Sequence, residues 1–103
     1  MPRTPIHPGE ILGDELNEIG ISAAELARTL GVPANRISQI IARKRAISAD
    51  TALRLARHFG TTPDLWMNLQ KLYELDLARQ RAGETISHIP QRPPAATPVP
   101  SRP

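Results

Sequence analysis

Apolar residues recur at three- and four-residue spacing in five stretches of the chain, and each stretch lies between helix start and stop signals. The first is expected to begin at His7-Pro8 and to end at Gly20, with Ile11, Leu12, Leu16 and Ile19 as its buried stripe. Ser22 with Glu25 forms a capping box for the second stretch, and Pro33 begins the third at about its first position. The pattern therefore predicts an all-α fold.

The last two stretches have equally clear starts. Ser48 is the expected cap of the fourth helix, which ends at Gly60, and Thr62-Pro63-Asp64 is expected to begin a fifth helix that continues to about Ala82. Apolar residues lie on more than one side of this fifth helix, so it needs a second buried contact, for which another protomer is the expected source. Trp66 is expected in the core.

The segment 22–45 holds the most informative pattern, because it predicts two short helices joined by a tight turn at Gly31-Val32. Ile37, Ile40 and Ile41 share one face of the second of these helices. The opposite face carries Asn35, Arg36, Gln39 and Arg43, and Lys44 and Arg45 follow. Asn and Gln can read adenine in the major groove and Arg can read guanine, so this helix-turn-helix pattern indicates DNA binding.

The composition changes from Glu84 onward, where prolines become frequent. We expect residues 6–82 to form the DNA-binding domain and residues 84–103 to form a disordered, Pro-rich tail with polyproline II character. A weak signal for a short strand covers Thr85–Ile89, and the prolines leave open a partner-binding role.

Charge is distributed unevenly along the chain. Residues 1–31 hold two arginines against five carboxylates, whereas residues 32–58 hold six Lys or Arg against Asp50 alone. The basic block coincides with the expected reading helix, which favours a phosphate-facing surface over an ordinary solvated face.

Other classes of protein find little support. There is no cysteine, no run long enough to span a membrane and no apolar leader, so a soluble cytoplasmic protein without disulfides is expected. The three histidines are isolated, and no phosphate-binding glycine loop or nucleophile–base pair is evident. We therefore expect neither an enzyme nor a metal or other cofactor, and we interpret His7 as the N-terminal entry to the first helix.

Several motifs in order resemble the HigA/VapI type of antitoxin, within the Xre and lambda-repressor-like helix-turn-helix class. The most specific are HPGE at residues 7–10 and TPDLWMNLQ at residues 62–70, followed by Tyr73-Glu74-Leu75. Between them lie the Leu-Ala and Ile-Ser-Gln-Ile-Ile stretches of the helix-turn-helix and Lys44-Arg45. The chain departs from the family in having Ala42-Arg43 where Asn-Gly is frequent, Ala23 where the wider class often has Gln, and Pro33 in place of Ser or Thr.

The resemblance implies a five-helix lambda-repressor-like domain that dimerises, binds double-stranded DNA at a palindromic operator, represses its own operon and neutralises a RelE-like ribonuclease toxin. The DNA-binding residues expected are Ser22, Ala34, Asn35, Arg36, Ser38, Gln39, Arg43, Lys44 and Arg45. The Ser38 hydroxyl could instead bond to its own helix.

An acidic surface would complement a basic ribonuclease, so the toxin-binding residues expected are Glu10, Asp14, Glu15 and Glu18. Two alternatives stay open. One is a stand-alone helix-turn-helix transcriptional regulator with no toxin partner, and the other is a protein-interaction module whose basic face binds an acidic protein.

Overall fold

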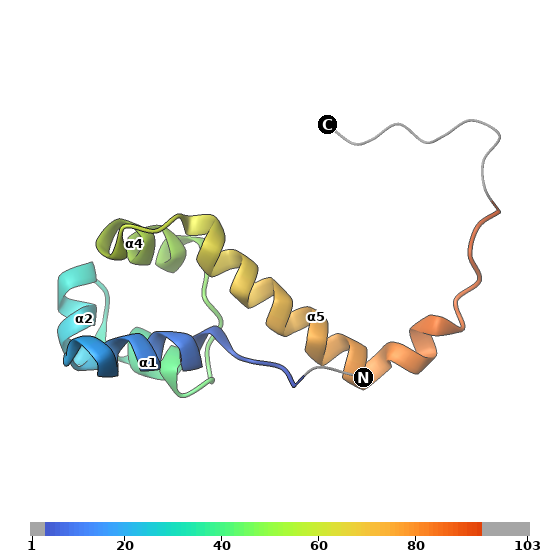
Figure 1. Cartoon of the computed structure of the whole chain (residues 1–103), viewed down its shortest axis with the longest axis horizontal. Coiled ribbons are helices and arrows are strands. Elements are labelled where there is room, and N and C mark those ends of the chain that lie inside the picture. Colours follow the sequence, from blue (N-terminus) through green and yellow to red (C-terminus); the bar gives the residue numbers. More distant parts are fainter. Residues whose placement is uncertain (1–3, 94–103) are drawn as a thin grey trace.

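The computed structural model describes residues 4–93, and within that range it contains five α-helices and no strand. They are α1 (Pro8–Ile19), α2 (Ala23–Leu30), α3 (Ala34–Ile41), α4 (Ala49–Phe59) and α5 (Pro63–Ser87) (Figure 1). The predicted all-α fold of five helices is confirmed. The tail expected at residues 84–103 lies outside the described residues from position 94 onward.

Local capping explains where the helices begin and end. Ser22 and Glu25 form the predicted capping box, and the side chains of Ser48 and Thr62 accept hydrogen bonds from the first turns of α4 and α5. Pro33 is the residue before α3 rather than its first residue, and its side chain makes no capping bond. Three helices end in left-handed glycines, at Gly20, Gly31 and Gly60.

The core consists almost entirely of Leu, Ile and Ala side chains from α1 to α4 and of Ile47, and α5 contributes Trp66. Its fully buried members include Leu12, Leu26, Ile37, Ile40 and Leu55, and Trp66 is buried as expected. Each such side chain stabilises the fold by about 1.5–3 kcal/mol relative to exposure. Two residues of the expected buried stripe of α1 are not part of the core, because Ile11 and Ile19 are 37% and 47% exposed.

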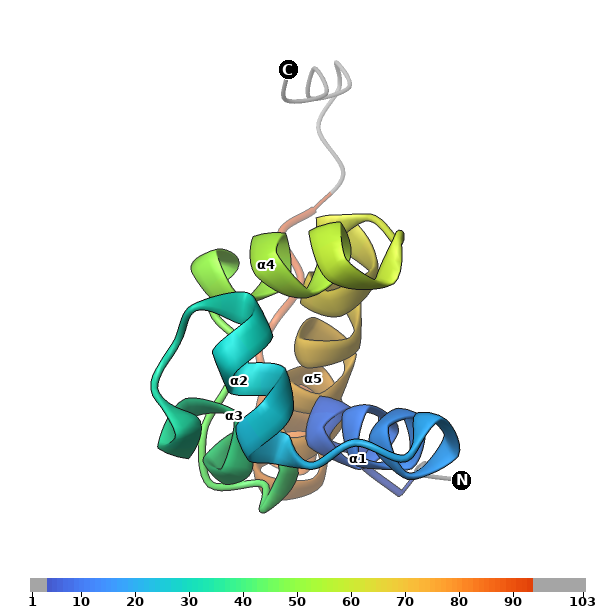
Figure 2. The same cartoon turned by 90° about the vertical axis from the view of Figure 1, so that its left-hand side faces the viewer.

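The helices form a compact head from which one helix extends. The pair α2–α3 packs against α1 on one side, and α4 packs against the first half of α5. Figure 1 shows the second half of α5 projecting beyond the other helices. Figure 2 shows α4 along one edge of the head and α1 and α3 along the other, where α1 packs directly against α3.

The close approach of α1 to α3 depends on a glycine. A Cβ atom at Gly9 would overlap the carbonyl oxygen of Ile40, so no other residue fits at this position without a shift of the backbone. Gly9 therefore allows the start of α1 to contact the backbone of α3 directly.

The C-terminal half of α5 differs from the sequence prediction. The helix continues to Ser87, five residues beyond the expected end, and the predicted strand over Thr85–Ile89 is wrong. Within this last turn the Ser87 hydroxyl donates to the carbonyl oxygen of Glu84 at 2.6 Å. The stop signal is Pro90, which disfavours helical geometry in the residue before it, whereas Gly83 is accommodated inside the helix.

Candidate DNA-binding surface

The turn between α2 and α3 presents a polar helix face to solvent. Gly31 adopts φ +75°, which turns the chain after α2, and its N–H bonds back to the last turn of that helix. Because Ile37 and Ile40 point into the core, the opposite side of α3 is left outward. Ala34, Asn35 and Ser38 are exposed on α3, and Ser22 is exposed at the start of α2. The structure thus brings the expected reading residues to one surface.

The Ser38 hydroxyl bonds to its own helix, which is one of the two roles that the sequence left open. It lies 3.4 Å from the carbonyl oxygen of Asn35. Asn35 is exposed.

Arg36 is held by α4 rather than extending freely. Its guanidinium donates to Asp50 at 2.8 Å, and Arg54 donates to the same carboxylate oxygen at 3.0 Å. Arg54, followed by Arg36, lowers the pKa of the Asp50 carboxyl below its ordinary value by hydrogen bonding to the ionised form. Arg54 also donates to the carbonyl oxygen of Leu30 at 2.8 Å, so this cluster ties α4 to the end of α2 and to the start of α3.

Gln39 and Arg45 form a second pair across the same surface. The Arg45 Nε–H donates to the Gln39 side-chain oxygen at 2.9 Å. Lys44 is exposed between Arg43 and Arg45, and its backbone N–H bonds to the carbonyl oxygen of Gln39 at 2.8 Å. The basic loop is therefore attached to the end of α3.

Arg43 has an unusual backbone. Its φ is 64°, and it is the one non-glycine residue with positive φ among residues 4–93. The left-handed region favours glycine. The Asn-Gly that the family resemblance led us to expect at 42–43 would suit this geometry, so the departure to Ala42-Arg43 introduces local strain in exchange for a cation.

His7 connects the start of α1 to the basic loop and to α5. Its Nδ1 accepts the N–H of Gly9 at 2.8 Å, its ring meets Tyr73 edge to face at 4.7 Å, and it bonds to the backbone of Arg45. Burial lowers the pKa of His7 below its ordinary value, and the Arg43 cation acts in the same direction against an opposing effect of Glu10. The expected role as entry to the first helix is confirmed by this capping geometry.

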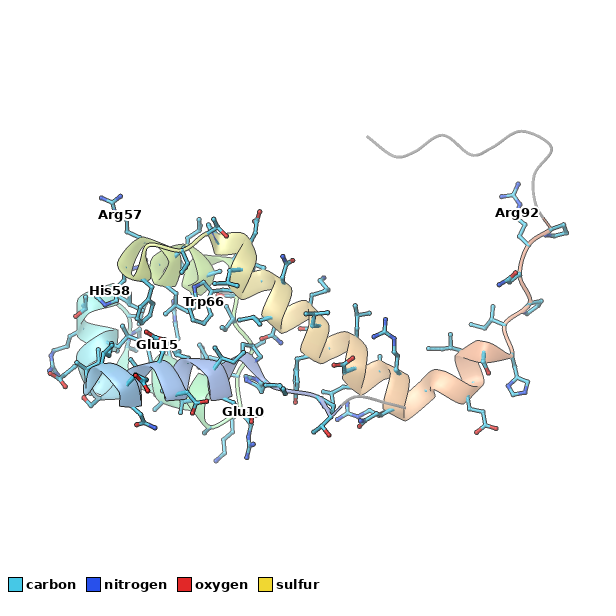
Figure 3. The ribbon with its side chains drawn as sticks, in the orientation of Figure 1. Glu10, Glu15, Arg57, His58, Trp66 and Arg92 are labelled. Carbon is cyan, nitrogen blue, oxygen red and sulfur yellow. The ribbon has the colours of Figure 1, made fainter. Side chains whose placement is uncertain are left out.

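The four expected toxin-binding carboxylates separate into two groups. Glu10 accepts the backbone N–H of His7 and lies 3.7 Å from the Arg43 guanidinium, so it belongs to the surroundings of the basic loop. Asp14, Glu15 and Glu18 are exposed along α1. Glu15 also borders an apolar groove lined by Ile11, Leu65, Trp66 and Leu69; Figure 3 labels Glu15 and Trp66 on the facing helices α1 and α5.

The basic block of residues 32–58 is divided between α3 with the loop after it and α4, and Asp50 joins the two parts by bonding to both Arg36 and Arg54. Arg36, Arg43, Lys44 and Arg45 surround α3, whereas Arg57 projects outward from α4 (Figure 3). The sequence analysis missed two residues that hold the surroundings of α3 in place: Asp50, which bonds to Arg36, and the buried Gln70 of α5. Gln70 accepts the backbone N–H of Ile47 at 2.9 Å, and no periodicity or motif indicates a contact between residues 23 positions apart.

Neither a metal site nor a membrane-spanning helix is present among residues 4–93. No group of three or more His, Cys, Asp or Glu side chains is placed to hold a metal ion there. None of the described helices combines the length and the apolar character that crossing a membrane requires.

Comparisons with known proteins agree with this geometry. Residues 12–66 match the helix-turn-helix family model HTH_3. Virulence-associated protein I of Dichelobacter nodosus is 50% identical over 76 residues, which cover 73% of this chain and 70% of that protein.

Two solved structures are similar over most of the chain. An addiction module antidote protein of the HigA family from Coxiella burnetii is 46% identical with a TM-score of 0.85, covering 87% of this chain and 99% of that one. The antitoxin HigA of Pseudomonas aeruginosa, solved with the higBA promoter, is 49% identical with a TM-score of 0.82, covering 85% and 97%.

Proposed function

Because the chain belongs to the helix-turn-helix family of HigA/VapI-type antitoxins, we propose that it binds a palindromic operator as a dimer, represses its own operon and neutralises a RelE-like ribonuclease toxin. The observation that carries the DNA-binding part is the outward polar face of α3, bordered by the loop of three consecutive cations at 43–45. Relatives solved with operator or promoter DNA support the same assignment.

Each expected residue has a role that fits its place. Asn35 and Gln39 face the groove and read bases, whereas Ser22, Ser38, Lys44 and the first backbone N–H groups of α3 near Ala34 contact phosphates. Arg36 reaches DNA by exchanging Asp50 for a phosphate or a base. Arg43 contributes positive charge at the edge of the surface.

Titration of variants against specific and scrambled duplexes tests the DNA assignment. Gln39→Ala should weaken operator binding by roughly 1–3 kcal/mol and relax preference at one base pair. Lys44→Ala should weaken both duplexes alike and lower the salt slope by about one. Unchanged operator affinity in Gln39→Ala would contradict the assignment of α3 as the reading helix.

The projecting half of α5 supports dimerisation. Leu72, Leu75 and Ile86 are exposed and recur at helical spacing on one face, with Ala82 between them. An exposed apolar face of this kind is costly in a free monomer and is satisfied by a second copy. A two-fold dimer places two reading helices about 34–36 Å apart, one turn of DNA.

The exposed carboxylates of α1 support a toxin-binding surface separate from the DNA surface. Glu10 lies beside the basic loop, whereas Asp14, Glu15 and Glu18 are exposed along α1, so a protein bound to these three carboxylates leaves the outward face of α3 accessible. Asp14, Glu15 and Glu18 attract a basic ribonuclease, and the groove beside Glu15 adds apolar area.

Charge reversal tests the toxin assignment. Glu15→Lys with Glu18→Lys should slow association with the small basic protein encoded by the adjacent reading frame, most strongly at low salt, and should change operator affinity by less than about threefold. Glu84→Lys, an exposed reversal far along α5, is the matched control. Loss of operator binding with intact toxin binding would show that the two surfaces are assigned backwards.

The second candidate is a stand-alone transcriptional regulator of the same fold. Several relatives of 31–40% identity are described as HTH-type transcriptional regulators, which favours keeping it. Absence of a small basic protein encoded beside this chain, together with intact operator binding, would select this candidate.

A further inference from the structure

A series of hydrogen bonds, interrupted by the backbone of residues 45–47, connects α5 to the Gln39 side chain of α3. It begins at Glu74, whose carboxylate accepts a side-chain N–H of Gln70 at 2.9 Å. The Gln70 oxygen accepts the backbone N–H of Ile47 at 2.9 Å. Arg45, two residues before Ile47, donates to Gln39 at 2.9 Å.

Burial makes the hydrogen bonds at the α5 end of this series specific. Gln70 and Ile47 are 5% and 2% exposed, so water does not replace the amide oxygen as a partner for the Ile47 N–H. Glu74 accepts from the nitrogen end of the Gln70 amide, which fixes the oxygen end toward Ile47. Gln70 therefore determines where the basic loop rejoins the core.

The loop is held at three places. Its beginning bonds to the end of α3 through the backbone N–H groups of Arg43 and Lys44, its middle contacts His7, and its end is held by Gln70. Arg45 thus projects from a defined backbone.

At the α3 end, Arg45 selects the orientation of an amide. Gln39 reads adenine by accepting with its oxygen and donating with its nitrogen, and a flipped amide would reverse both. Arg45 has only donors, so its bond to the Gln39 oxygen identifies that atom and leaves a second lone pair and the NH₂ group for a base.

Resting on the DNA binding proposed above, we propose that Arg45 is a specificity-determining residue that orients Gln39, and that Gln70, oriented by Glu74, is the positioning residue for the Arg45 loop. This goes beyond the sequence expectation, in which Arg45, like Lys44, is simply one of the DNA-binding residues. The base favoured at the Gln39 position is adenine.

The test uses the full chain and two duplexes. One carries the palindrome footprinted upstream of this chain's own reading frame, and the other carries a substitution at the base pair whose discrimination is lost in Gln39→Ala. The variants are Arg45→Lys, which keeps the charge but loses the planar Nε–H donor, and Lys44→Ala as the control for charge in the same loop.

Arg45→Lys should reduce the ratio of the two affinities by about 5- to 100-fold, the range of one lost bidentate contact. Lys44→Ala should leave that ratio unchanged while weakening both duplexes. In the Gln39→Ala background Arg45→Lys should have no further effect on the ratio, because no amide remains to orient. An unchanged ratio in Arg45→Lys overturns the proposal.

Gln70→Met tests the α5 end. It should reduce the same ratio and speed exchange of the Ile47 amide hydrogen, while core amides of α2 keep their protection. The double variant Gln70→Glu with Glu74→Gln retains an acceptor for Ile47 and a donor between the two side chains, so it should restore the ratio toward that of the parent chain. Faster Ile47 exchange with an unchanged ratio would remove Gln70 from the proposal.

Two outcomes keep this test distinct from that of the proposed function. A parent chain that shows no preference between specific and scrambled duplexes would refute the operator-binding function itself. Failure of Gln70→Met to fold leaves Arg45→Lys, a surface substitution, to decide the proposal.

Discussion

Replacing Arg43 by glycine should leave the fold more stable than replacing it by alanine, and both substitutions should weaken its attachment to DNA. Arg43 has φ 64°, in the left-handed region. That conformation costs a residue with a Cβ atom about 1–2 kcal/mol. Glycine removes this cost, but its greater conformational freedom in the unfolded chain destabilises the folded state by about 0.4–1 kcal/mol.

The remaining contribution is the ion pair. Arg43 lies 3.7 Å from Glu10, and both side chains are largely exposed, at 60% and 41%. Exposed pairs at such distances contribute between zero and about 1 kcal/mol. Arg43→Ala loses this pair too but keeps the left-handed strain, so it is the matched control. The expected difference between glycine and alanine at position 43 is about 0.5–1 kcal/mol in favour of glycine.

Thermal unfolding followed by circular dichroism measures the difference. For a domain of this size, 1 kcal/mol corresponds to a shift of about 4–8 °C, so Arg43→Gly should melt roughly 2–8 °C above Arg43→Ala. Protomer concentration must be equal in all samples, because dimerisation makes the melting temperature depend on concentration. Operator titrations of both variants should show a salt slope smaller by about one than that of the parent chain.

A glycine variant that melts at or below the alanine variant would refute the strain argument. It would mean that the loop tolerates the left-handed arginine without cost, or that the backbone relaxes when the side chain is removed. Equal salt slopes in the parent chain and in both variants would separately refute a phosphate contact by Arg43.

Three further substitutions test the fold, the pH dependence and the dimer. Gly9→Ala should destabilise the fold by about 3 kcal/mol or more, because the added Cβ meets a backbone carbonyl oxygen of α3. Gly83→Ala, whose Cβ would have no neighbour within 4 Å, should stabilise α5 by about 0.5–1 kcal/mol. Urea unfolding compares the two variants. The lowered pKa of His7 means that the native state resists its protonation. The contribution of His7 to stability should therefore be fully present above about pH 6.5 and fall as the pH drops through the folded-state pKa. A melting temperature that depends equally on pH in His7→Asn would contradict this. Leu75→Asp should convert the dimer to monomer in light scattering, while Leu53→Asp, at a leucine on α4 that is also exposed, should not.

The features that the sequence determined are those governed by neighbouring residues. Ser22 with Glu25, Ser48, and Thr62 before Pro63 predicted the starts of α2, α4 and α5, because a cap acts on N–H groups within one turn. The three-residue and four-residue spacing of isoleucines predicted which side of α3 is buried, and with it the outward polar face. The end of α5 was misplaced, since a glycine inside a helix and one that ends it look alike in sequence.

Only the tertiary structure decided which of the predicted residues contact one another. Arg36 with Asp50, Ile47 with Gln70, and His7 with Tyr73 are separated by 14, 23 and 66 positions. Capping and periodicity extend over one or two helical turns, whereas these contacts depend on how α4 and α5 pack against the helix-turn-helix. Packing also placed Glu10 beside the basic loop rather than with the other α1 carboxylates, because Gly9 allows the start of α1 to approach the end of α3 directly.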